Sequence, residues 1–187
     1  MSKDVEAIKQ TLATLKEVGV DAFLWAGTLL GAYREGDFIK GDSDVDIAYL
    51  SSQKNPREVA KELAYIYRQL HERDFLADYF DENWQKHKGA DIKTVFGQAH
   101  LRTERPFMDF FTLWNFKGQT YDPWYGPMGF TLELGDTAPI KDIEFPVPKN
   151  TEKVLEFLYG DWKTPKKEKG TKYHKFGMQL KDCCGVV

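Results

Sequence analysis

Hydrophobic and polar positions change their period several times along the first third of the chain, and each change predicts a new element. Apolar residues recur three or four positions apart up to Gly19, which is the spacing of an amphipathic helix. A continuous apolar run at 22–26 and an alternating run at 44–50 predict two strands. Because Gly27 follows the first run and helical spacing resumes after it, we expect a short helix between the strands.

In the remainder of the chain the sequence predicts two helices with several extended segments between them. Asn55 precedes Pro56 and a long helical pattern, and a last helix is predicted from Asn150 to a stop at Gly160. Between them, extended segments are expected near residues 75–80, 92–101 and 107–116, followed by a turn at 117–119, one more strand and a loop at 121–129. This alternation of helices and strands predicts an α/β (α+β) fold.

Composition and charge narrow the class of protein. A length of 187 residues suits one domain, and a net charge of −3 argues against a nucleic-acid partner. No apolar run approaches the roughly 20 residues of a transmembrane segment, and the N-terminus lacks a signal-peptide pattern. The two cysteines, Cys183 and Cys184, are adjacent, so they make a poor disulfide framework. We therefore expect a cytoplasmic protein.

Lysines gather near the C-terminus, with six of them between residues 163 and 175. No repeat or linker divides the chain before this point. We therefore expect a single folded domain over residues 1–162 and a basic, flexible tail over 163–187. Contact of this tail with an anionic polymer or a membrane surface is the weaker of two interpretations, solvation being the other.

The most informative stretch is the acidic run at 42–47, DSDVDI. On a strand Asp44 and Asp46 lie on one face, with Asp42 close behind. Carboxylates gathered on one face raise one another's pKa unless a cation is present, and Mg²⁺ (or Mn²⁺) is held by carboxylates together with substrate phosphates. The alternative is a solvent-facing strand whose polar side happens to be aspartate. An EF-hand, a P-loop and a zinc site are excluded because the required residues are missing at their spacings.

A second acidic signal is Asp109, within the apolar run PFMDFFTLW. On a strand this carboxylate shares a face with Phe107 and Phe111, where it is costly unless it is paired or binds a metal. One interpretation is a buried salt bridge to Arg102 or Arg105. The other is a third metal ligand, delivered by a strand beside the first pair.

The turn after the first strand, Gly27-Thr28, carries a third signal. Glycine lets the backbone approach a ligand closely, and the start of a helix offers free N–H groups to a phosphate. Arg34, at the end of the same predicted helix, would offset phosphate charge. These residues predict a phosphate-binding turn ahead of the acidic run.

A glycine turn, an Asp-x-Asp strand and a later lone aspartate together resemble the nucleotidyltransferase fold that includes DNA polymerase β. The resemblance is closer to the LicD/fukutin-related family, which implies a mixed sheet flanked by helices. The stretches that carry it are WAGTLLGAYR at 25–34, Phe38-Ile39, the acidic run at 42–47, Asp109, FPVP at 145–148 and LYGDW at 158–162.

The resemblance implies a transferase that moves a phosphate-linked group from a CDP-linked donor, such as CDP-choline or CDP-ribitol, to a hydroxyl of a glycan or small acceptor. In the mechanism we expect, Asp44 and Asp46 hold Mg²⁺ on the diphosphate. Asp109 completes a second metal position or acts as the general base. Asp42 is expected either to orient the metal ligands from behind or to bind the metal through water, and Gly27 and Thr28 are expected to cradle phosphate.

Two other functions stay open at this point. One is a nucleotidyltransferase that moves a nucleoside monophosphate from an NTP to a small molecule such as an antibiotic. The other is a catalytically silent domain that binds nucleotides or a protein partner. An aromatic stretch also has two interpretations, a cage for a choline ammonium or ordinary core packing. Its members are Trp114, Phe116, Tyr121, Trp124 and Tyr125.

Overall fold

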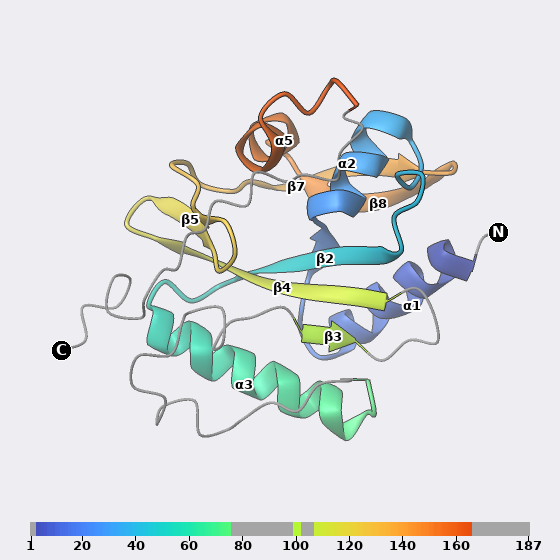
Figure 1. Ribbon diagram of the computed structural model, residues 1–187. Helices are drawn as coiled ribbons and strands as arrows, with labels where there is room; N and C mark the ends of the chain where they lie inside the picture. The colour runs from blue at the N-terminus through green and yellow to red at the C-terminus, as the bar shows by residue number, and fades with distance from the viewer. Residues whose placement is uncertain (1–2, 76–98, 102–106, 166–187) are drawn as a thin grey trace.

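A mixed sheet runs through the middle of the protein in the computed structural model, which describes residues 3–75, 99–101 and 107–165 (Figure 1). The two longest strands, β2 and β4, are parallel neighbours, and the other pairings are antiparallel. Strand β3 pairs with the first half of β4 and β5 with its end. In spatial order the strands are β1 (Ala22–Leu24), β2 (Asp44–Ser51), β4 (Phe107–Phe116), β5 (Gln119–Asp122) and β6 (Gly126–Pro127), with β3 (Ala99–Leu101) beside β4.

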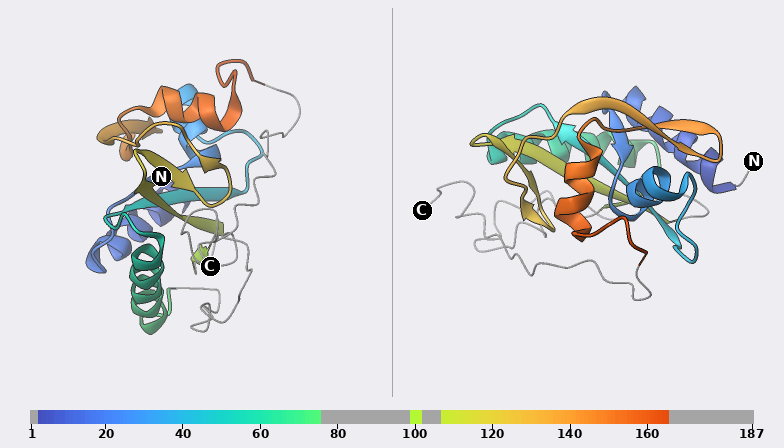
Figure 2. Two further views of the ribbon diagram at one scale, coloured as in Figure 1. Left: turned by 90° about the vertical axis from the view of Figure 1, so that its left-hand side faces the viewer. Right: turned by 90° about the horizontal axis from the view of Figure 1, so that it is seen from above.

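Each face of the sheet is covered by a separate layer, as the turned views also show (Figure 2). Helices α1 (Lys3–Glu17) and α3 (Pro56–Glu72) cover one face. The other face carries α2 (Ala26–Glu35), α5 (Thr151–Tyr159) and a hairpin of β7 (Leu134–Ile140) and β8 (Ile143–Pro148). This confirms the predicted mixed sheet flanked by helices. Among the described residues, no helix is long and apolar enough to cross a membrane.

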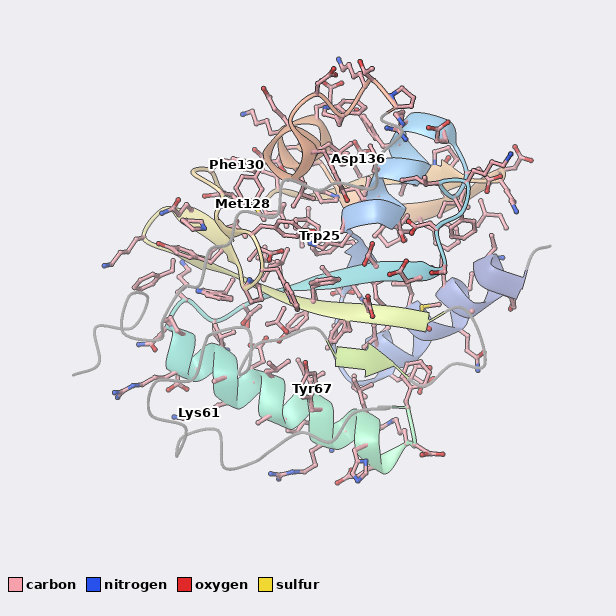
Figure 3. The ribbon with its side chains drawn as sticks, in the orientation of Figure 1. Trp25, Lys61, Tyr67, Met128, Phe130 and Asp136 are labelled. Atoms are coloured by element: carbon pink, nitrogen blue, oxygen red, sulfur yellow. The ribbon has the colours of Figure 1, made fainter. Side chains whose placement is uncertain are left out.

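Helix α3 shows how the sequence pattern produces the packing. Asn55 accepts a hydrogen bond from the Arg57 amide at 2.9 Å, and Pro56 occupies the first turn, so the helix starts where the sequence predicts. Its apolar stripe is buried, and Figure 3 shows Tyr67 directed toward the sheet and Lys61 away from it. Burial of this stripe against the sheet stabilises the helix more than its intrinsic propensity does.

The structure differs from the sequence prediction at three places, one of which is the loop expected at 121–129, where β5 extends to Asp122 and pairs with β6. Ala26 begins α2 instead of ending β1, because the Trp25 carbonyl already accepts the first helical hydrogen bond, from Leu29, at 2.8 Å. The β7–β8 hairpin was not predicted at all, since Pro139 and Pro146 interrupt its strands in the sequence. The extended segment expected at 75–80 and most of that at 92–101 lie outside the described residues.

The loop from α2 to β2 lies tightly against the helix, and this loop carries Asp42. A Cβ on Gly31 would lie 2.7 Å from the Asp37 carbonyl oxygen and 3.0 Å from the Ile39 amide nitrogen, so only glycine fits there. The turn of the β7–β8 hairpin also holds the first residue of this loop, because the Lys141 amide donates to the Gly36 carbonyl at 2.9 Å. The first half of the loop is therefore held by both α2 and the hairpin.

Candidate metal centre

Three carboxylates meet on one face of the sheet, where β2 and β4 run side by side. Asp46 is in register with Asp109 on the neighbouring strand, and Asp44 lies two residues before Asp46 on the same face. One ligand oxygen from each of Asp44, Asp46 and Asp109 lies within 4.8 Å of the others. The structure therefore brings together the three aspartates that the sequence analysis selected, although they come from strands about 60 residues apart in the chain.

The chemistry of this cluster suits a hard divalent cation. Asp109 is only 6% exposed, and the side chains of Asp44 and Asp46 are partly buried. The cluster offers only carboxylate oxygens, which are the ligands that Mg²⁺ and Mn²⁺ prefer. Three negative charges so close together are costly in a partly buried site, and a bound cation would remove that cost.

The turn from β1 into α2 holds Asp46 through three hydrogen bonds. The Gly27 amide donates to the Asp46 carboxylate at 2.8 Å, and the Asp46 amide donates to the Thr28 hydroxyl at 2.9 Å. The Trp25 amide donates to the Asp46 carbonyl at 2.9 Å. Backbone and side chain of this aspartate are thus both fixed by the strand-to-helix turn, which also places the positive end of the α2 dipole beside the carboxylates.

Gly27 leaves no room for a side chain between two of the carboxylates. A Cβ at this position would lie 2.9 Å from an Asp42 oxygen and 3.1 Å from an Asp46 oxygen. Asp42, in the loop before β2, therefore brings a fourth carboxylate to the same turn, as expected from its place just ahead of the pair. The close approach of these groups depends on glycine at residue 27.

The sequence predicts that Gly27 and Thr28 bind a substrate phosphate, but it does not predict their hydrogen bonds to Asp46. A short strand that runs straight into a Gly-Thr helix start, followed by an acidic strand, was the signal available. Arg34 lies in the last turn of the same helix, and it donates to the Glu35 carboxylate at 2.7 Å and to the Trp162 carbonyl at 3.0 Å. Because about 9 Å of helix rise separate Arg34 from Thr28, the structure places the arginine at the opposite end of α2.

The aromatic stretch forms packing in the core. Trp114 and Tyr121 are buried and stacked, with ring centroids 5.8 Å apart, and Tyr125 is buried as well. Phe116 and Trp124 are partly buried against the same core. The burial of three members favours the packing interpretation over a cage open to a ligand.

The environment of Asp46 raises the pKa of its carboxyl group. Burial, and then the neighbouring charges of Asp109 and Asp44, raise the pKa of Asp46 to about 8 from its ordinary value of 3.8, against the opposing effect of the Gly27 N–H. Because the carboxylates are coupled, the proton belongs to the cluster as a whole. The cluster without metal therefore holds a proton at neutral pH.

This shift predicts how stability depends on pH. Between about pH 4 and pH 8 the folded protein binds a proton that the unfolded chain has lost, so stability falls as pH rises, by up to about 1.4 kcal/mol per pH unit. We expect urea unfolding in EDTA to show this fall, and Asp46→Asn to remove most of it. Added Mg²⁺ should stabilise the protein most at the upper end of the range. Equal slopes for the two proteins would contradict the assigned pKa.

Comparison with known proteins agrees with the mixed sheet and the aspartate cluster described above. Residues 19–150 match the family model described as the LicD/FKTN/FKRP nucleotidyltransferase domain, a range that includes all three clustered aspartates. The chain is also similar to a ribitol 5-phosphate transferase, FKRP, of Mus musculus, with 28% identity over 113 residues. That alignment covers 56% of this chain and 22% of the mouse protein, so the chain spans about a fifth of this relative.

Proposed function

The chain belongs to the LicD/FKTN/FKRP family, and on that premise we propose that it transfers a phosphate-linked group from a CDP-linked donor to a hydroxyl. The group is a polyol phosphate such as ribitol phosphate, or phosphocholine, and the acceptor is a glycan or a small molecule. The observation that carries the proposal is the meeting of Asp44, Asp46 and Asp109 beside the N-terminus of α2. The name of the mouse relative favours ribitol phosphate.

In this proposal the three clustered aspartates have different roles. Asp44 and Asp46 hold Mg²⁺ or Mn²⁺, and Asp46 is kept in place by its hydrogen bonds to the α2 turn. A cation bound there would neutralise charge that develops on the donor diphosphate. Asp109, the most buried of the three, completes the metal site or accepts the proton of the attacking hydroxyl on a carboxylate oxygen.

The N-terminus of α2 favours a diphosphate at the same place. The positive end of a helix attracts phosphate, and the Thr28 hydroxyl retains its own hydrogen when it accepts from the Asp46 amide. We propose that this turn lies beside the donor phosphates. A contribution from Arg34 stays a prediction, since its described hydrogen bonds go to Glu35 and Trp162.

We propose that residues 1–162 form the catalytic domain. The family match ends at residue 150, and α5 adds a further helix up to Tyr159. Most of the basic segment at 163–187 lies outside the described residues, so its flexibility and its partners stay predictions. The cytoplasmic location expected from the sequence is a prediction of the same kind.

The family model is described as a nucleotidyltransferase domain, so transfer of a nucleoside monophosphate from an NTP is the second candidate. The released product distinguishes the two. We would incubate the full chain with CDP-ribitol, CDP-choline or each of the four NTPs, with Mg²⁺ or EDTA, and identify products by chromatography. The proposal expects CMP from a CDP-linked donor, in Mg²⁺ only. Pyrophosphate from an NTP would favour the second candidate, and nucleotide binding without turnover would favour the silent domain.

A further inference from the structure

A further aspartate, Asp122 at the end of β5, is completely buried and does not belong to the carboxylate cluster. One of its oxygens accepts hydrogen bonds from the amides of Trp124 and Tyr125, at 2.6 and 2.9 Å. The other accepts from the indole N–H of Trp25 at 3.1 Å. A buried carboxylate is costly unless hydrogen bonds satisfy it, and these three donors fix the position of the Asp122 side chain.

The partner Trp25 is the residue at which β1 becomes α2. It is fully buried, and Figure 3 shows it between the central sheet and the layer of α2 and the hairpin. Its amide donates to the Asp46 carbonyl and its own carbonyl accepts from Leu29. Trp25 is therefore shared by the sheet, the helix and Asp122.

The turn that follows Trp25 is strained. Ala26 has φ of +39°, a conformation that residues with a Cβ rarely adopt. Such a turn persists only when the surrounding structure fixes it. Directly after it come Gly27 and Thr28, which bond to Asp46.

We propose that Asp122 is a positioning residue for the metal centre. By holding the Trp25 indole it fixes the strained turn, and through that turn the amide of Gly27 and the hydroxyl of Thr28 that orient Asp46. This inference rests on the proposed function, because it takes the aspartate cluster as a cation site. It assigns a role to a residue that lies outside the cluster and acts on it through Trp25.

Two substitutions separate the hydrogen bond from the fold around it. In Asp122→Asn the oxygen that caps the Trp124 and Tyr125 amides can be retained, while an NH₂ group faces the indole N–H, so that two donors meet. Trp25→Phe removes the indole N–H and keeps an aromatic ring. In the Trp25→Phe background, Asp122→Asn no longer creates a conflict of donors.

Thr120 supplies the matched control. It lies two residues before Asp122 on the same strand and is equally buried. Its hydroxyl donates to the Asn115 side chain at 2.6 Å and accepts from the Leu132 amide at 2.7 Å. Thr120→Val therefore removes buried hydrogen bonds from β5 without changing the partner of Trp25.

The test is a titration of the full-length chain with Mn²⁺, in which free Mn²⁺ is measured by electron paramagnetic resonance. We expect Asp122→Asn to weaken binding about tenfold, the low end for groups that orient metal ligands. In the Trp25→Phe background, Asp122→Asn should cause no further loss of Mn²⁺ affinity. Thr120→Val should lower the unfolding temperature and leave the Mn²⁺ affinity unchanged. The five tryptophans give resolvable indole N–H signals in ¹⁵N NMR, and that of Trp25, assigned from Trp25→Phe, should shift in Asp122→Asn.

The measurements distinguish failure of the positioning role from failure of the metal centre. A shifted Trp25 signal with unchanged Mn²⁺ affinity would overturn the positioning role while leaving the metal centre intact. An equal loss of affinity in Thr120→Val would show that general destabilisation of β5 is the cause, and would overturn it too. If the unmodified protein binds no Mn²⁺, the proposed metal centre fails and this inference fails with it.

Discussion

Asp46→Asn should reduce turnover by about 1,000-fold or more while the protein stays folded. Asp46 is the aspartate that is central to the cluster and held by α2, and the charge stabilisation that a metal supplies amounts to several kcal/mol of the barrier. Asparagine can still accept the hydrogen bond from Gly27. Because the folded site favours the neutral form of Asp46, the variant should unfold at the same or a higher temperature at pH 8. The loss of turnover is measured as the rate of product formation from the donor that the unmodified protein uses.

Asp136→Asn is the matched control for this experiment. Asp136 lies on β7, is exposed, and accepts a hydrogen bond from the Thr137 amide that asparagine would preserve. Turnover should be unchanged in this variant. Activity of Asp46→Asn within tenfold of the unmodified protein would contradict the proposed mechanism.

Asp109→Asn distinguishes between the two roles left open for this residue. A metal ligand and a general base both predict loss of turnover, but only a ligand predicts weaker Mn²⁺ binding. Loss of turnover with unchanged Mn²⁺ affinity would assign Asp109 the role of base.

Gly27→Ala has the second largest expected effect, a loss of Mn²⁺ affinity of at least tenfold and a larger loss of turnover. The added methyl carbon would lie 2.9 and 3.1 Å from oxygens of Asp42 and Asp46, so one or both carboxylates must move. Gly27 is not among the described residues with positive φ, so its backbone accepts alanine and the strain falls on the site. Mn²⁺ titration measures the loss of affinity, and the rate of product formation measures the loss of turnover.

Gly19→Ala serves as the control for Gly27→Ala. Gly19 has φ of +82°, and no atom of the described residues beyond its chain neighbours lies within 4 Å of the position that a Cβ would take. Alanine there therefore costs about 1 kcal/mol of stability through backbone strain alone. We expect its Mn²⁺ affinity to match that of the unmodified protein. Unchanged affinity in Gly27→Ala would show that the close contact at the turn does not position the carboxylates.

The parts of the site that could be predicted are those set by local periodicity. Asp44 and Asp46 share a face because side chains alternate along a strand, whatever the strand pairs with. The pairing of Asp46 with Asp109 depends on the register of β2 and β4, which no local pattern contains. The apolar environment of Asp109 was the available signal, and it indicated a buried acid without naming its partners.

The contacts between distant segments could not be predicted. Trp25 and Asp122 are 97 residues apart, and an aspartate before Pro123 in the sequence is typical of a turn rather than of a buried hydrogen bond. The β7–β8 hairpin could not be predicted because it contains prolines and many exposed residues, and its place is set by packing of β8 against β1. Local sequence thus predicted the helices and the two central strands, while tertiary packing set the hairpin and determined which polar groups meet.

The central claim is that Asp44, Asp46 and Asp109 together hold a divalent cation. The most direct measurement is an anomalous difference map from crystals grown with Mn²⁺ and CDP. We expect one peak or a close pair of peaks, each at roughly 2–2.6 Å from oxygens of this cluster. A map in which Mn²⁺ binds elsewhere, with no peak at the three aspartates, would contradict it.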